Sequence, residues 1–164
     1  PWPGIAGMIV FRIALPVCAS MAAGEKPAEA GLRVDRAALA WIAAGLGVAG
    51  IVYGMRHGTT FPPASWTRVG SAGALVAYLS LVALAEEVTF RGFLQRRLSH
   101  LLPFWAGLLL ASVAFAVWHG VWAPPEVILF RFAAGLVLGL LYHLGGSLLA
   151  PVVCHVLLSV ILAV

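Results

Sequence analysis

The sequence predicts an all-α fold: a polytopic membrane bundle of about six transmembrane helices, forming one domain over residues 1–164. Of the 164 residues, 62% are hydrophobic and 10% are charged, whereas soluble domains contain about half apolar and about a quarter charged residues. Apolar stretches of about 20 residues, the length that a helix needs to cross a bilayer, recur along the chain. None shows the alternation of a barrel strand, so helices are the expected spanning elements.

Six apolar stretches are separated by polar, proline or glycine breaks. The clearest breaks are the loops at residues 24–36 and 56–68 and the pairs Pro124-Pro125 and Gly145-Gly146. Proline and glycine at such positions favour a turn over continued helix. The expected spans are residues 5–23, 37–55, 69–99, 103–123, 126–143 and 147–164.

Basic residues are distributed unequally between the two sides of the expected bundle. The loops at residues 24–36 and 96–102 share one side and contain Lys26, Arg33, Arg36, Arg96 and Arg97. The opposite loops contain only Arg56 and Arg68. Because cytoplasmic loops are enriched in Lys and Arg, the first side is predicted to face the cytoplasm and both termini the outside.

The expected third helix contains two adjacent carboxylates and an arginine: Glu86, Glu87 and Arg91. One charge at bilayer depth costs roughly 3 kcal/mol even on lenient scales, so three together require an explanation. Glu87 and Arg91 are four residues apart, in the favourable order for a helical ion pair. Glu86 points about 100° away and is left outside that pair. Arg12, inside the first span, is accommodated by snorkelling or by a polar cavity.

Helix lengths place two histidines at the depth of Glu86. If the third helix continues past the arginines, Glu86 and His119 lie roughly 20 Å and 24 Å from the turn that joins helices three and four. His155 lies roughly 12 Å from the glycine turn before the last helix. These heights agree if the hairpin tip, which contains Gln95, Arg96 and Arg97, projects beyond the bilayer. A helix that ends at Ala85 is the alternative, and it would leave the carboxylates in water, away from both histidines.

The converging residues suit acid–base chemistry on a water molecule. A glutamate close to imidazoles can act as a general base. His155 and Ser159 are four residues apart and share a helix face, so both could donate to a developing oxyanion. Phe115, four residues before His119, is expected to form a wall of the same cavity. Packing explains one histidine equally well, but the joint occurrence of these polar residues at one depth favours a functional site.

Three motifs resemble one protein family. They are Glu86-Glu87-x-x-x-Arg91, Phe115-x-x-x-His119 and His155-x-x-x-Ser159. The chain resembles the CPBP family (CAAX proteases and bacteriocin-processing enzymes, also called Abi proteins), which are intramembrane endopeptidases related to the type II CAAX prenyl endopeptidase. The resemblance covers residues 71–164, the expected catalytic core.

The resemblance implies peptide-bond hydrolysis inside the membrane by a glutamate-activated water. Glu86 and His119 are then expected to activate the water, and Glu87 with Arg91 to hold the geometry of the site. His155 and Ser159 are expected to stabilise the oxyanion, although the family often has Asn or Asp where this chain has Ser159. No cofactor is expected. The alternative is a zinc ion held by Glu86, His119 and His155 with a fourth position open.

The expected substrate is a membrane-embedded peptide or protein tail, lipidated or carrying a C-terminal sorting signal. The excess of basic over acidic residues, 10 against 6, is too small to indicate a nucleic-acid partner. The expected location is a bacterial inner (plasma) membrane, with the active site inside the bilayer and nearer the cytoplasmic side. The competing interpretation is a non-enzymatic membrane protein, a proton- or ion-coupled carrier or a bacteriocin-immunity factor, that uses the Glu/His cluster for binding.

Overall fold

The computed structural model describes residues 7, 9–24, 31, 33, 35–57, 72–120 and 122–163, apart from the side chains of residues 57, 72 and 163. Lys26 and Arg68, which contribute to the predicted orientation, lie outside these residues, as do most of the loop at 56–68 and the expected starts of the first and third spans. The orientation of the chain in the membrane therefore stays a prediction.

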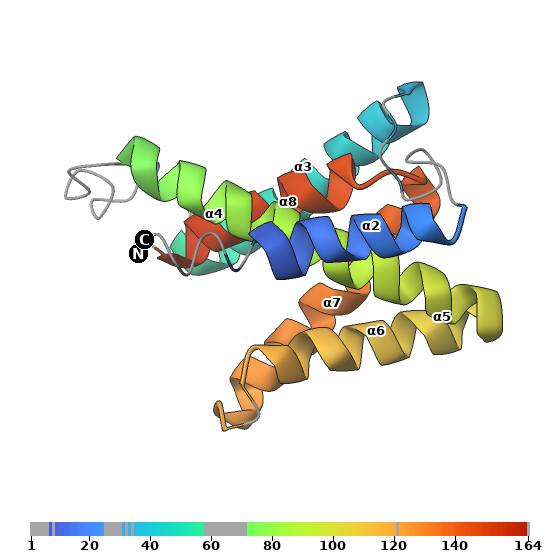
Figure 1. Cartoon of the computed structure of the whole chain (residues 1–164). Helices are drawn as coiled ribbons and strands as arrows, with labels where there is room; N and C mark the ends of the chain where they lie inside the picture. Colours follow the sequence, from blue (N-terminus) through green and yellow to red (C-terminus); the bar gives the residue numbers. More distant parts are fainter. Residues whose placement is uncertain are drawn as a thin grey trace.

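The described chain is helical, which confirms the all-α fold class. Two π-helical segments, η1 and η3, continue directly into α-helices. The elements are η1 (Val10–Ala14), α2 (Leu15–Ala22), α3 (Arg36–His57), α4 (Ala72–Glu87), η3 (Val88–Gln95), α5 (Arg96–Leu101), α6 (Phe104–Trp118), α7 (Pro125–Gly145) and α8 (Leu149–Ala163) (Figure 1).

Among the described residues, three helices are long and apolar enough to cross a bilayer: Arg36–Arg56, Gly73–Leu101 and Pro125–Gly145. They support an integral membrane protein. The other apolar helices are shorter, and α6 and α8 have 15 residues each. A 15-residue helix rises about 22 Å, against a hydrocarbon core of about 30 Å. The predicted count of about six membrane spans is therefore not confirmed.

The central element is the long helix formed by α4, η3 and α5, which runs without a break over Gly73–Leu101. This confirms that the third helix continues past the two carboxylates and the arginines. It ends where Leu102 takes an extended conformation before Pro103, which caps the next helix. The first helix (η1 and α2) packs against α4 and η3. Helix α6 packs against η3 and α5, and α8 packs against α4 (Figure 1).

Helix α6 ends earlier than predicted. Its last residue is Trp118, and His119 is the residue that caps its C-terminus. The expected continuation to Ala123 is wrong because Gly120 has a φ of +120°, a left-handed conformation that glycine tolerates and a helix does not contain. Pro124 and Pro125 then begin α7. As a consequence, His119 is presented from a helix end.

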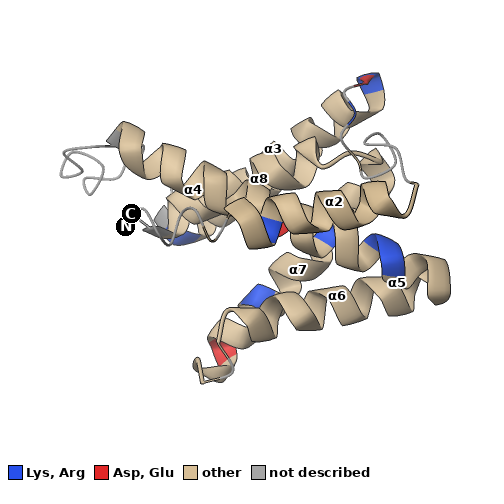
Figure 2. Ribbon diagram, in the orientation of Figure 1, with Lys and Arg blue, Asp and Glu red and all other residues tan. Residues whose placement is uncertain are grey.

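The hydrophobic core surrounds the buried charges. Phe90, Phe115, Leu138, Leu141 and Leu158 are among its members. Acidic and basic residues are sparse along the ribbon, and the two colours meet beside the first helix, where it packs on the central one (Figure 2). The two cysteines, Cys18 and Cys154, are free thiols, the first exposed and the second buried.

Candidate active site

Glu87 is completely buried and forms the rigid part of the cluster. Its Oε1 accepts hydrogen bonds from Nη1 of Arg91 at 2.8 Å and from Nδ1 of His155 at 2.7 Å. The other terminal nitrogen of Arg91 donates to the carbonyl oxygen of Gly135 at 3.1 Å. The predicted ion pair four residues apart is therefore present. It ties the central helix to α7 and α8.

Glu86 lies at the meeting point of three elements and is 4% exposed. Its Oε1 is 3.3 Å from Nη1 of Arg12. Its Oε2 is 3.2 Å from Nε2 of His119 and 3.7 Å from Nε2 of His155. The expected convergence of Glu86 with both histidines is thus observed, with the two carboxylate oxygens engaged on different sides.

The two imidazoles present the same nitrogen to Glu86. Nδ1 of His119 is 2.7 Å from the carbonyl oxygen of Phe115, and a carbonyl can only accept, so this Nδ1 carries the hydrogen. Nδ1 of His155 likewise donates to ionised Glu87. In a neutral ring Nε2 is then an acceptor, as is the carboxylate that faces it. Oε2 of Glu86 is buried and has no hydrogen-bond partner among the described residues, so it can still accept a proton.

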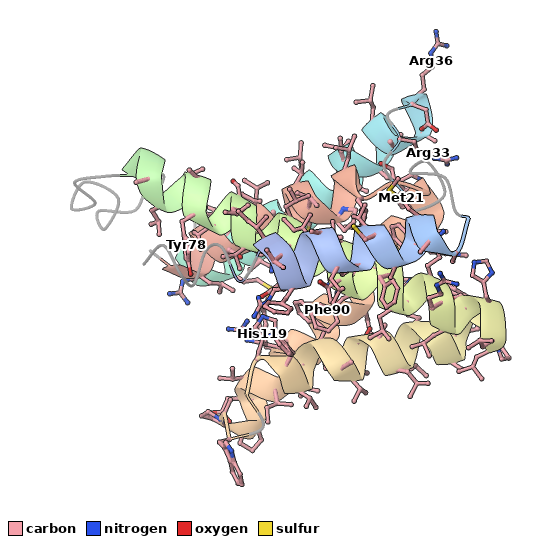
Figure 3. The ribbon with its side chains drawn as sticks, in the orientation of Figure 1. Met21, Arg33, Arg36, Tyr78, Phe90 and His119 are labelled. Atoms are coloured by element: carbon pink, nitrogen blue, oxygen red, sulfur yellow. The ribbon has the colours of Figure 1, made fainter. Side chains whose placement is uncertain are left out.

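Phe115 packs against the polar cluster, and its expected role as the wall of a cavity stays a prediction. Its ring centroid lies 4.4 Å from Cζ of Arg91, 4.5 Å from the His119 ring and 5.7 Å from the His155 ring. Phe90 packs edge-on against it at 5.3 Å. Phe90 and His119 point into the space between the first helix and α6 (Figure 3). These rings keep the polar cluster in an apolar surrounding.

Two glycines let α7 approach the central helix and α6. A Cβ at Gly135 would lie 3.0 Å from Cβ of Ser112, and one at Gly139 would collide with side chains of Leu108 and Gln95. The carbonyl oxygens of both glycines accept hydrogen bonds from the central helix, Gly135 from Arg91 and Gly139 from Gln95 at 3.0 Å. Gln95 is therefore buried between the helices. Its expected place at a hairpin tip beyond the bilayer stays a prediction.

The central helix and the helices α6 to α8, which hold most of the site, lie in a region that matches a known protein family. Residues 68–161, more than half of the chain, match the family described as "Type II CAAX prenyl endopeptidase Rce1-like". The chain belongs to this family. The chain is also similar to the protein described as "Uncharacterized protein YpbD" of Bacillus subtilis (strain 168), with 32% identity over 84 residues. That alignment covers 51% of this chain and 40% of the relative, so the chain spans less than half of the relative's length. No solved structure matches the chain.

Five of the six predicted site residues of this Rce1-like chain come together, namely Glu86, Glu87, Arg91, His119 and His155. The sixth, Ser159, lies one turn after His155 on α8 and is partly buried. Within the part of the chain that the structure describes, no hydrogen bond of Ser159 is found. Its place in an oxyanion site stays a prediction.

Arg12 contacts the site through Glu86, a partner that the sequence does not reveal. Snorkelling was one of two expectations for it, and the structure instead places its guanidinium on Glu86. Arg12 lies outside the residues that match the Rce1-like family. The available signal is the presence of a cation well inside an apolar stretch, which favours a partner in the bundle interior.

The zinc alternative concerns Glu86, His119 and His155. Among the residues that the structure describes, no group of three or more His, Cys, Asp or Glu side chains is arranged to hold a metal ion. The carboxylate and the His119 ring instead face each other at hydrogen-bonding distance. Metal dependence is consequently a question for experiment.

Proposed function

We propose that this chain is an intramembrane endopeptidase that hydrolyses a peptide bond of a membrane-embedded substrate through a water activated by Glu86. Membership of the Rce1-like protease family supports this proposal. The observation that carries it is the buried carboxylate oxygen Oε2 of Glu86, which faces Nε2 of both His119 and His155. This is the arrangement that a general base with a proton relay requires.

In the proposed reaction, Oε2 of Glu86 accepts a proton from a water molecule, and the resulting hydroxide attacks the substrate carbonyl carbon. His119 is fixed with its Nδ1–H on the Phe115 carbonyl, so its Nε2 can take the proton from Glu86. The C–N bond then breaks, and the proton passes to the leaving amine. The products are a carboxylic acid and an amine, which exchange a proton to give a carboxylate and an ammonium group, and both residues return to their starting state.

Glu87 and His155 supply the second function of the site, stabilisation of the oxyanion. A carboxylate bound to Nδ1 orients an imidazole and stabilises its protonated form. When His155 has taken up a second proton from water at Nε2, this N–H can donate to the oxyanion of the tetrahedral intermediate. Arg91 compensates the charge of Glu87 at 2.8 Å, which keeps Glu87 structural and leaves Glu86 as the reactive carboxylate. Ser159 is the proposed second donor.

The proposed substrate is a membrane-anchored C-terminal tail, lipidated or carrying a sorting signal. The family name refers to prenylated CAAX tails, and the apolar surroundings of the site suit a substrate that arrives through lipid. We place the reaction in a bacterial inner membrane, nearer the cytoplasmic side. This placement rests on the loop charges of the sequence.

Cleavage of a panel of membrane-anchored tail peptides in detergent tests the proposal. Wild type, Glu86→Gln and the control Glu126→Gln, which changes an exposed carboxylate in the first turn of α7, are each assayed with and without a strong chelator. The proposal expects cleavage by wild type and the control, and only a residual rate, about 10²- to 10⁴-fold lower, in Glu86→Gln. Chelator-sensitive cleavage restored by zinc would assign ligand roles to Glu86, His119 and His155. No cleavage by wild type would favour the proton- or ion-binding alternative.

A further inference from the structure

We propose that Arg12 is the positioning residue for Glu86: it holds Oε1, so that Oε2 stays directed at the two imidazoles. This inference rests on the proposed function, because it assigns the residue that aligns the general base. Arg12 belongs to the first helix, outside the residues that match the Rce1-like family. The site is therefore completed by a segment that the family match does not include.

Arg12 is held at three points. Its Nη1 lies 3.3 Å from Oε1 of Glu86, and its Cζ lies 4.7 Å from the centroid of the Trp118 ring. Its backbone carbonyl lies 2.8 Å from Oγ1 of Thr89, whose one hydroxyl hydrogen is shared with the carbonyl oxygen of Ala85 at 2.9 Å. Thr89 lies three residues after Glu86, so the backbone and the side chain of Arg12 are both fixed to the same part of the central helix. A snorkelling arginine would make neither of the two side-chain contacts.

Each of the two adjacent glutamates forms an ion pair with its own arginine, and the two pairs are built alike. Arg91 lies in the π-helix η3 and pairs with Glu87, and Arg12 lies in the π-helix η1 and pairs with Glu86. Each guanidinium also packs on an aromatic ring, that of Phe115 or Trp118. Single π turns inside helices are frequent at functional sites. The parallel indicates that Arg12, like Arg91, belongs to the site.

The two pairs differ in exposure, which suggests different roles. The Arg91 side chain is 1% exposed, whereas that of Arg12 is 29% exposed. Glu87 is fixed from two sides on one oxygen, whereas Arg12 occupies only Oε1 of Glu86 and leaves Oε2 for the histidines and a water. A carboxylate without that anchor rotates about its last torsion, which is broad and shallow. Loss of Arg12 therefore lowers the population of the reactive orientation.

The kinetic test compares Arg12→Gln and Arg12→Lys with the control Arg56→Gln, which changes an exposed arginine at the end of α3. Misplacement of a catalytic group by about 1 Å costs about 100-fold in rate. We expect Arg12→Gln to lower kcat by about 10- to 100-fold with little change in KM. Arg12→Lys should recover part of kcat because it restores the charge without the planar fork. An unchanged kcat, or a change in KM alone, would overturn the inference.

Non-additivity separates positioning from a purely structural role. If Arg12 acts through Glu86, Arg12→Gln causes no further loss of residual activity in a Glu86→Gln background. A structural role would lower the thermal stability and the activity of both backgrounds alike. Thermal unfolding in detergent is recorded for every variant, so that loss of folded protein is not mistaken for loss of kcat.

A second measurement does not depend on turnover. A hydrophobic carbodiimide modifies carboxyl groups, and mass spectrometry of the digested protein gives the labelled fraction of Glu86. We expect several-fold more labelling in Arg12→Gln than in wild type, an intermediate value in Arg12→Lys, and equal labelling of exposed Glu126 in all three. If wild type cleaves no substrate, the proposed function fails while this result still decides whether Arg12 engages Glu86. Equal labelling of Glu86 in wild type and Arg12→Gln would contradict the inference.

Discussion

Oε1 of Glu87 lies 2.7 Å from Nδ1 of His155, although the two residues are 68 positions apart in the chain. The bond connects the central helix with α8 at the depth of the site, and it fixes the face that the imidazole turns toward Glu86. Glu87, the residue next to the proposed base Glu86, thus sets the orientation of the His155 ring.

The His155 imidazole is predicted to be essential for cleavage and dispensable for folding. His155→Gln keeps a polar side chain of similar size but removes the imidazole that the hydrogen bond to Glu87 orients. Removing one oxyanion donor typically costs about 10²- to 10³-fold in kcat, so we expect a loss in that range. Cleavage and thermal unfolding are measured together, and retention of more than a tenth of the activity in folded protein would contradict the assignment.

Loss of Arg91 should destabilise the protein strongly. Arg91→Met leaves the fully buried Glu87 carboxylate without its cation, and breaking a buried pair in this way costs about 3–5 kcal/mol. Unfolding by denaturant in detergent measures the change. The matched control is Arg56→Met, whose guanidinium is exposed and whose removal should cost about 0–1 kcal/mol. Similar values for the two variants would show that the Glu87 pair adds little.

Gly135 is predicted to be needed for the close approach of α7 to α6. Gly135→Ala places a Cβ 3.0 Å from Cβ and 3.1 Å from Cα of Ser112, so the helices must separate. Such overpacking costs about 1–3 kcal/mol, and it moves the carbonyl oxygen that accepts from Arg91. The control is Gly47→Ala in α3, where nothing lies within 4 Å of the added Cβ and helix propensity favours Ala. Denaturant unfolding distinguishes the two, and equal stability would refute the packing argument.

Ser159 gives a direct test of the oxyanion assignment. Removing one oxyanion donor typically costs about 10²- to 10³-fold in kcat, so Ser159→Ala should show a loss of that order if the hydroxyl donates. Ser159→Asn, the residue type frequent in the family that the motifs resemble, should retain activity. A kcat within a factor of two of wild type for Ser159→Ala would leave His155 as the proposed donor. Stability should change little, since Ser159 makes no hydrogen bond among the described residues.

The sequence was sufficient to predict the meeting of Glu86 with His119. Helical rise is constant, and the two helices are joined by a short turn, so counting residues from that turn gives comparable depths. The Glu87–Arg91 pair follows from spacing alone. Both results depend on local geometry or on neighbouring helices. Their catalytic roles stay predictions until cleavage is measured.

The contacts that the sequence did not predict depend on helix rotation and on close packing. Arg12 reaches Glu86 from a helix that is distant along the chain, and no local spacing encodes which face it turns inward. Gln95 is buried between the helices because Gly139 lets α7 come close enough to offer a carbonyl. The early end of α6 likewise reflects one backbone angle at Gly120.

The short helices α6 and α8 have a consequence for the lipid around the site. Each rises about 22 Å, several ångströms less than a typical hydrocarbon core, and these helices present His119 and His155. If α6 and α8 cross the bilayer, this hydrophobic mismatch is relieved when the surrounding bilayer becomes thinner, at a cost of fractions of a kcal/mol per ångström. We expect the membrane to be thinnest beside the two histidines, where water then has the shortest path to the carboxylate that would activate it.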